Sequence, residues 1–481
     1  MGRLLRGNES ARRLELLEGA LAMGWMYDHW RESAAVLWGR VVMCSIALLF
    51  VVVAFPVIRT PFDSVTAATP RPYPTPRVDL RPFLHEQRGR TVTAESRDDL
   101  GRAINEADGR LGGSPGVIVV RGGGSIKTQV VVSHDLNFQP GVYSCDTKTP
   151  WQGCILLKDG VKAEALGDVT MLEPTYAEPN APAITVFQAF AAAQKNESAS
   201  RNVTVKGFHI RGRQRLTDGG VRQSISFGNC TACAAIGNTL DGVTSIGIQF
   251  GGSAAGGNHA SNCVAAGNTV IASVAAGIAV VNATDVWVFD NTILRPSREG
   301  GPGGVSGVDI ETNNTDDWCE NVKIYNNRID YTGAALKYGA GSAILAQNVY
   351  NSPRAGGLLI ANNNITGGAP TTENLSLSNG IYFTGAFPGA LVVSNTIRTA
   401  KQHGLLLYGS RGATFRDLEI DSCGGGGNPA VRIVGGGGNR FINLNIYTPP
   451  GVTVNTDPAI WETEGTSGNV FEGNTVNAER H

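Results

Sequence analysis

Short stretches of alternating apolar and polar residues recur along most of the chain, and many of them end in an Asn-x-aliphatic triplet. Small or apolar residues lie five and three positions before nearly all of these asparagines, as at Val286 and Val288 before Asn291. An alternation of two is typical of a strand with one buried face. The asparagines of the repeated triplet are Asn238, Asn268, Asn291, Asn327, Asn363, Asn395 and Asn474, and Leu418 and Leu444 take this place in two further copies.

Successive copies of the triplet are 23 to 36 residues apart. A repeat of this length is typical of a solenoid whose coils carry loops of variable size. Because no coil can bury its apolar side alone, stacking gives each coil a neighbour about 4.8 Å away. The repeated Asn would then form an inward ladder that bonds coil to coil, which is a structural role.

A second repeated motif, Gly-aliphatic-x-aliphatic, adds another strand to each coil. Its glycines are Gly247, Gly277, Gly307, Gly380 and Gly404. The fold class predicted from both motifs is all-β, a single parallel β-helix. The same register places Cys233 and Cys263 in the core, where free cysteine behaves as a small hydrophobe.

The regions before the repeats predict three further segments. Residues 1–40 form a tail, residues 41–58 form one transmembrane helix, and the Pro-rich residues 59–84 form an extended stalk. The β-helix domain is expected over residues 85–481. At its start, Ser96 and Asp99 are spaced as a capping box that opens a short amphipathic helix through Ala107, suited to cap the apolar end of the solenoid.

The predicted span contains 18 residues without a charge, just enough to cross a bilayer as a helix. A cleaved signal peptide is the alternative, but its apolar core would be shorter and nearer the start. Arginines are nearly balanced on the two sides, so the positive-inside count does not settle orientation. The nature of the C-terminal part favours a single-pass membrane protein whose β-helix is exported to an extracellular, periplasmic or lumenal space.

The net charge and the cysteines indicate which classes of partner and which cellular compartment fit this chain. The formal net charge of −1 argues against a nucleic-acid partner. Cys145 and Cys154 flank a Pro-Trp turn and are predicted to form a disulfide, which fits an oxidising compartment. Cys230 and Cys233 form half of a zinc or redox motif, but the sequence has no second CxxC or His pair to complete a zinc site.

The Asn ladder, the Gly-aliphatic-x-aliphatic strands and the opening DDLGRAINEAD…GVIVVRGGG together resemble the pectate-lyase-like superfamily of right-handed parallel β-helix proteins. The likeness covers about Arg97 to Val476. It implies a right-handed solenoid and a polysaccharide or other glycan as partner. It does not choose an activity, since the superfamily includes lyases, glycosidases, epimerases, tailspikes and adhesins.

The outward residues of the second motif are predicted to form two rows along the surface. The first row is Ser226, Gln249, Ala279, Asp309, Ile344, Tyr382, Leu406 and Arg432. The second row is Val281, Glu311, Ala346, Thr384 and Tyr408. Most members are small, apolar or aromatic, so Asp309 and Glu311 stand apart as an acidic pair.

Asp309 and Glu311 are two residues apart on one strand, which puts their Cα atoms roughly 6.6–6.8 Å apart with both carboxylates outward. This spacing suits an acid and a base flanking a water molecule, as in inverting glycosidases, or two ligands of a Ca²⁺ ion. Nearby turns supply Lys337 as a candidate base, with Arg298 and Tyr338 as candidate uronate-binding groups. The competing interpretation is that the acidic pair is simply solvated.

We therefore predict a membrane-anchored, polysaccharide-active protein with a lyase- or glycosidase-like site at Asp309, Glu311 and Lys337. Tyr382 and Tyr408 would supply aromatic platforms for sugar rings. The alternative is a non-catalytic surface protein that binds glycan or mediates adhesion through the same face. Asn314-Thr-Asp316 matches one polygalacturonase motif, but the other signatures of that family are missing from the sequence.

Overall fold

The structure is a computed structural model, and the residues that it describes lie within Ser64–His481. The described residues are 72–84, 86–147, 153–174, 185–190, 199–212, 223–252, 259–296, 305–333, 341–367, 378–424, 428–447, 459–463 and 465–477. Residues 1–71, which include the predicted membrane span over 41–58, lie outside this set. Among the described helices, none is long and apolar enough to cross a bilayer.

The described residues form three long sheets, here named A, B and C, in which every strand pair is parallel. Sheet A contains β1 (Arg90–Ala94), β2 (Gly116–Val120), β5 (Asp135–Phe138), β8 (Lys162–Ala165), β11 (Ser200–Arg201), β12 (Thr204–Lys206), β15 (Cys230–Thr231), β16 (Ala234–Ile236), β19 (Ala260–Ala266), β22 (Ala283–Phe289), β25 (Cys319–Glu320), β26 (Lys323–Tyr325), β29 (Ala355–Gly356), β30 (Leu359–Ala361), β33 (Leu391–Val393), β36 (Thr414–Arg416), β40 (Arg440–Ile442) and β44 (Val470–Glu472).

Sheet B contains β3 (Gly124–Ile126), β6 (Gly141–Cys145), β9 (Val169–Leu172), β13 (His209–Arg211), β17 (Thr239–Asp241), β20 (Thr269–Ile271), β23 (Thr292–Leu294), β27 (Arg328–Asp330), β31 (Asn364–Thr366), β34 (Thr396–Arg398), β37 (Glu419–Asp421), β41 (Asn445–Tyr447) and β45 (Thr475–Asn477). Sheet C contains β4 (Val130–Val132), β7 (Ile155–Leu157), β10 (Phe187–Ala189), β14 (Gln223–Phe227), β18 (Ile246–Gly251), β21 (Ala276–Val281), β24 (Ser306–Glu311), β28 (Ser342–Gln347), β32 (Asn379–Thr384), β35 (His403–Tyr408), β38 (Val431–Val434) and β42 (Ile460–Glu462). A short pair, β39 (Gly436–Gly437) and β43 (Thr466–Ser467), stands beside them.

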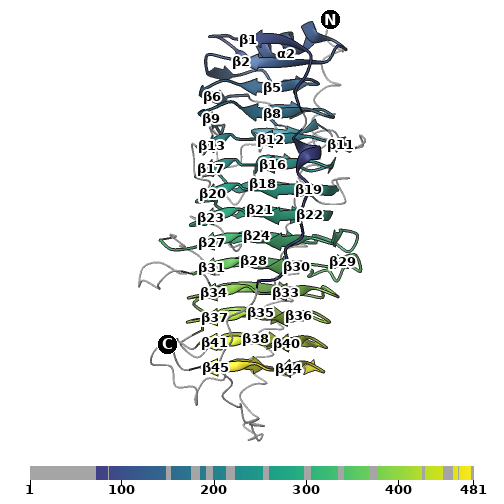
Figure 1. The fold of residues 1–481 in the computed structure, drawn as a ribbon, viewed down its shortest axis with the longest axis vertical. Helices are drawn as coiled ribbons and strands as arrows, with labels where there is room; N and C mark the ends of the chain where they lie inside the picture. Colours follow the sequence, from purple (N-terminus) through teal and green to yellow (C-terminus); the bar gives the residue numbers. More distant parts are fainter. Residues whose placement is uncertain are drawn as a thin grey trace, which may run out of the picture. The chain divides into compact units, whose positions relative to one another are not determined.

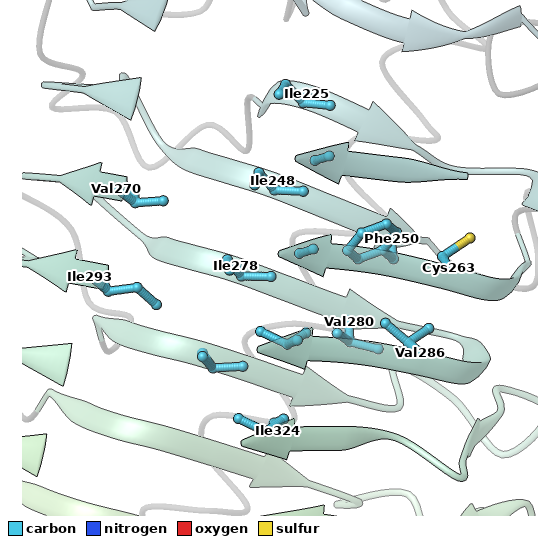
Figure 2. Packing of buried hydrophobic residues seen from close by; sticks show 14 of the residues in the cluster. Ile225, Ile248, Phe250, Cys263, Val270, Ile278, Val280, Val286, Ile293 and Ile324 are labelled. Carbon is cyan, nitrogen blue, oxygen red and sulfur yellow. The ribbon is translucent and has the colours of Figure 1, made fainter. Parts of the chain in front are cut away.

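Each coil passes through sheets A, B and C in turn, and each strand pairs with its counterpart one coil further on (Figure 1). This arrangement is the predicted parallel β-helix. Figure 2 shows how alternate residues of the three sheets meet inside it, with Ile278 of sheet C, Ile293 of sheet B and Val286 of sheet A all fully buried. Each such side chain stabilises the fold by roughly 1.5–3 kcal/mol.

The inward Asn ladder is present as predicted. The backbone N–H and the side-chain amide of Asn291 both donate to Asn327 Oδ1 at 3.0 Å, and the same bonds link the ladder residues from Asn238 to Asn395. The residue before each ladder position has positive φ, as at Asn326 with φ 57°. Gly, Asn and Asp tolerate that conformation best, which explains why they recur at this turn.

Helix α2 (Leu100–Leu111) lies at the first coil, beside β1 and β2. Its buried face, which includes Leu100 and Ile104, belongs to the main core cluster. The sequence placed the helix between Ser96 and Ala107. Its N-cap is instead Asp99, whose side chain accepts hydrogen bonds from the backbone N–H groups of residues 101 and 102, and its end is at Leu111.

Residues 72–84, called the strap below, lie against the outer face of sheet A (Figure 1). The side chain of Asn362, which follows β30, makes two hydrogen bonds to the backbone of Tyr73. Tyr73 N donates to Asn362 Oδ1 at 2.9 Å, and Asn362 Nδ2 donates to Tyr73 O at 2.8 Å. At the other end, in the 3₁₀-helix η1 (Arg81–Phe83), Phe83 O accepts from Thr204 Oγ1 at 3.1 Å. The predicted stalk is therefore extended here, but its described part packs on the solenoid instead of projecting freely.

Four apolar side chains of the strap pack on sheet A, which explains why the segment stays there. They are Tyr73, Val78, Leu80 and Phe83, and they contact an outer cluster that includes Val264, Phe289, Tyr325 and Val393. The two anchor strands, β12 and β30, are five strand spacings apart, or roughly 24 Å. The strap thus joins six coils through contacts that are distant in sequence.

We expect Phe83→Ala to lower the free energy of unfolding by about 2–3 kcal/mol, somewhat less than a deep core truncation, because the surface of sheet A can relax around the gap. Phe83 is 8% exposed. Urea denaturation monitored by circular dichroism would measure the change. Tyr350→Ala is the matched control, since Tyr350 is 52% exposed, and equal losses in the two variants would contradict the strap's stabilising role.

The cysteines in the described part of the chain divide into two disulfide pairs and several buried thiols. Cys145 and Cys154 form the predicted disulfide, with Cα atoms 6.0 Å apart. Cys230 and Cys233 form a second disulfide that the sequence did not predict. Cys263 is a free thiol in the core, as expected, and the apolar surroundings raise its pKa to about 12. Because Cys230 and Cys233 share a disulfide, neither offers a free thiolate to a zinc ion.

Candidate functional site

The outer face of sheet C carries two rows of residues that run from coil to coil. Its first row is Leu156, Gln188, Ser226, Gln249, Ala279, Asp309, Leu345, Tyr382, Leu406, Arg432 and Trp461. Its second row is Gly251, Val281, Glu311, Gln347, Thr384, Tyr408 and Val434. Asp309 and Glu311 are adjacent members of the two rows, as predicted.

The predicted register is wrong by one residue in one coil. Leu345 and Gln347, not Ile344 and Ala346, follow Asp309 and Glu311 in the rows, and Ile344 is buried in the core. The error arose because Ala343 replaces the glycine of the repeated motif in this coil. The shared serine that opens β24 and β28 would have given the correct register.

Strand β24 directs both acids outward because Val308 and Ile310, which alternate with them, are fully buried. Gly307 allows the neighbouring coil to approach. A Cβ atom built there would lie 2.7 Å from both Ala343 O and a methyl carbon of Ile329.

The turn after β24 is held by a network of hydrogen bonds. Thr312 Oγ1 donates to Asn348 Oδ1 at 3.0 Å, and Ser352 Oγ donates to Asp317 O at 2.7 Å. Asn348 Nδ2 donates in turn to Ser352 O at 3.1 Å. Since the strand and its turn are both fixed, the two carboxyl groups are held in position.

Asp309 is in an environment that favours its protonated form. Its Oδ1 atom is buried and accepts no hydrogen bond from any described residue. Burial, and then the adjacent charge of Glu311, raise the pKa of Asp309 well above its ordinary value, while a hydrogen bond from Gln347 opposes this. A carboxyl group with a raised pKa keeps its proton to a higher pH, which suits it to act as a general acid.

Glu311 has more support for its charged form. Gln347 Nε2 donates to its Oε2 atom at 3.2 Å, and Asn313 Nδ2 donates to its Oε1 atom at 3.3 Å. Burial raises the pKa of Glu311, the Asn313 hydrogen bond lowers it, and the charge of Asp317 raises it. The environments of the two acids therefore differ, with Asp309 the better proton donor and Glu311 the better carboxylate.

The predicted Ca²⁺ at the acidic pair stays a prediction. Gln347 and Asn313 present N–H donors to the Glu311 carboxylate, and the oxygens of such amides are also groups that Ca²⁺ can bind. Among the described residues, the one cluster of three metal-ligating groups consists of Cys230, Cys233 and Cys263. Two of those sulfurs share a disulfide, so that cluster offers one free thiol.

Aromatic and amide side chains occupy the two ends of the same face. Tyr382 lies two coils beyond Asp309, and Tyr408 lies in the next coil with 56% of its surface exposed. On the other side of the acids, Gln223 Nε2 donates to Gln249 Oε1 at 2.7 Å. Both predicted tyrosines thus lie on one face with the acidic pair.

Three of the predicted site residues, Arg298, Lys337 and Tyr338, lie outside the described residues, so their roles stay predictions. Asn314 and Asp316 lie in the turn after β24, where Asn314 Oδ1 accepts from Asp316 N at 2.9 Å. That bond is a local turn contact. His403, in sheet C, is buried, with its Nδ1 atom 2.7 Å from Pro429 O.

Comparison with known proteins supports the fold. No family model matches the chain, and no curated protein matches it in sequence. Among solved structures, a mutant tailspike protein of the E. coli bacteriophage HK620 in complex with a pentasaccharide matches 80% of this chain and 64% of its own, under two thirds, at 12% identity and a TM-score of 0.53. The catalytic domain of Agl-KA matches 80% of this chain and 69% of its own, at 12% identity and a TM-score of 0.53.

Proposed function

We propose that this parallel β-helix protein, which resembles the pectate-lyase-like superfamily, acts on a polysaccharide along the outer face of sheet C. The observation that carries this proposal is the acidic pair, Asp309 and Glu311, held side by side in unlike environments. The buried face of helix α2 belongs to the core cluster. The strap packs on sheet A, so it does not cover the outer face of sheet C.

In the proposed reaction, Asp309 donates a proton to the glycosidic oxygen while Glu311 acts as base toward a water molecule on the opposite side of the sugar. A β-eliminating lyase is the alternative chemistry, with Glu311 or Lys337 removing a proton next to a uronate carboxyl group. Both reactions create a new reducing end, but elimination leaves a double bond at the new non-reducing end, whereas hydrolysis leaves that end saturated. The proposal is tested by incubating the full chain with neutral and uronate polysaccharides and assaying both products. Absence of both across the panel would overturn it.

The rate is expected to fall as pH rises through the raised pKa of Asp309, since the acid must hold its proton. The free energy of unfolding is expected to fall with rising pH as well. A carboxyl group with a raised folded-state pKa stabilises the fold fully below its unfolded-state pKa of about 4. That contribution is lost as pH rises through the folded-state pKa. The pH profiles of kcat/KM and of the urea midpoint would check both. A rate that rises steadily with pH would exclude Asp309 as the acid.

A non-catalytic, glycan-binding or adhesive role is the second candidate. The exposed aromatic residues Tyr408 and Trp461, 56% and 43% exposed, favour it because stacking on sugar rings needs no acid and base. Binding without any product in the assay above would select this function.

Anchoring through residues 41–58 and export of the β-helix remain part of the proposal. The disulfides Cys145–Cys154 and Cys230–Cys233 support an oxidising compartment. Washing membranes from the producing cells with alkaline carbonate tests the anchor, since release of the full chain into the soluble fraction would argue against it.

A further inference from the structure

No described carboxylate forms an ion pair with Arg432, whereas three other arginines of the last coils each contact one. Arg398 pairs with Glu419 at 3.0 Å, and Arg416 pairs with Asp417 at 3.1 Å. Arg440 likewise contacts Glu472 at 3.3 Å. The Nε atom of Arg432 is buried and has no hydrogen-bond partner among the described residues. An arginine with unused donors is suited to bind an oxyanion from outside the chain.

Arg432 lies on the sheet C outer face next to an aromatic ring. Its guanidinium carbon is 5.6 Å from the ring centroid of Trp461, which follows it in the first row. Trp461 is 43% exposed, so its ring remains available to a ligand as well. A cation–π contact uses none of the hydrogen-bond donors of the guanidinium, so they stay available to a ligand.

The surroundings of Arg432 leave its positive charge uncompensated. Burial lowers the pKa of His403, the hydrogen bond to Pro429 opposes this, and the charge of Arg432 lowers it further, so His403 is neutral at neutral pH. Glu462, next to Trp461, accepts a hydrogen bond from Asn469 Nδ2 at 2.6 Å, and it alternates with Trp461 along β42, so its carboxylate points away from the row of Arg432. The end of the face therefore combines one fixed cation with exposed aromatic surface.

We propose that Arg432 and Trp461 form an anion subsite that binds an acidic group of the glycan, four coils from Asp309. This inference rests on the proposed function and names its substrate class as an acidic polysaccharide. The shared ligand chemistry is an oxyanion on a sugar ring, whether a carboxylate, a sulfate or a phosphate ester.

The row geometry sets the size of the ligand. Four strand spacings separate Asp309 from Arg432, or roughly 19 Å. Tyr382 and Tyr408 lie between them on the same face. A glycan that engages both the acidic pair and Arg432 must therefore be an oligosaccharide that runs parallel to the solenoid axis, with rings passing over the tyrosines.

The test measures binding of the full chain to an acidic polysaccharide and to the same polymer after reduction of its carboxyl groups. Sulfated and phosphorylated neutral polymers are included to identify the oxyanion, and polyglutamate serves as an anion without sugar. Arg432→Gln is expected to weaken binding of the preferred acidic polymer by about ten- to hundredfold and to leave the reduced polymer unchanged. Arg416→Gln, which removes a paired arginine of sheet A, is the matched control and should change neither.

Each outcome separates the subsite from the proposed function. Equal binding of the acidic and reduced polymers by the parent chain overturns the subsite while leaving a neutral glycan as substrate. An equal loss with both polymers in Arg432→Gln overturns it too, since the residue would then be structural. The parent chain could also bind polyglutamate through Arg432 and bind none of the polysaccharides. That result would support an anion site at Arg432 and overturn the proposed action on a glycan.

Discussion

Replacing Asp309 with asparagine is expected to lower kcat by about 10²–10⁴-fold, because asparagine cannot donate the proton that the leaving oxygen needs. Glu311→Gln should cause a loss of similar size, since the amide cannot serve as base or nucleophile. Both substitutions keep the shape of the side chain, and Asn313 and Gln347 remain in place around residue 311. Initial rates on the polysaccharide that the parent chain degrades would measure the loss, and equilibrium binding would show that the glycan still binds.

Stability gives this prediction a second readout. Two buried acids with raised pKa values destabilise the fold near neutral pH, so Asp309→Asn should leave the urea midpoint unchanged or raise it. Asp330→Asn is the matched control, because Asp330 lies on sheet B in an ion pair with Arg328 at 2.8 Å. A variant at Asp309 or Glu311 that keeps the parent rate would show that the acidic pair is not the site, and would favour the binding role.

The sequence predicted the coil architecture because its signals are periodic and local. The Asn of each coil and the apolar residues five and three positions before it determine which side chains point inward, and neighbouring coils confirm one another. The strap could not be found in this way. Tyr73 and Asn362 are 289 residues apart, and no periodicity links an isolated proline-rich segment to a distant sheet.

The site was predicted only in part, for a similar reason. The alternation of β24 was enough to place Asp309 and Glu311 on the outer face. The amide that binds Glu311 comes from the coil in which Ala343 replaces the motif glycine, so a one-residue error hid Gln347. The pairing of Cys230 with Cys233 was missed because a CxxC turn is compatible with a metal site, free thiols or a disulfide until its geometry is known.

The interior Asn ladder supports the second large prediction, which concerns stability. Asn327→Ala is expected to lower the free energy of unfolding by about 3–5 kcal/mol, since it leaves several buried polar groups without partners. Asn291 would lose the acceptor of its backbone N–H and of its amide, both at 3.0 Å, and Val288 O would lose a donor at 2.9 Å. Asn327→Asp should cost more, because a buried carboxylate would face the carbonyl oxygen of Val288.

The position of a ladder residue along the solenoid should determine the size of this effect. Asn474 belongs to the last coil, is 8% exposed, and makes two ladder bonds, to Leu444 N at 2.8 Å and Phe441 O at 3.0 Å. Water can replace these bonds at the open end, so Asn474→Ala should cost only about 1 kcal/mol. Asn327→Leu should fall between the two alanine variants, since leucine fills the space, as Leu418 does in its own coil. Urea midpoints that did not differ between Asn327→Ala and Asn474→Ala would mean that the ladder contributes little beyond the apolar core.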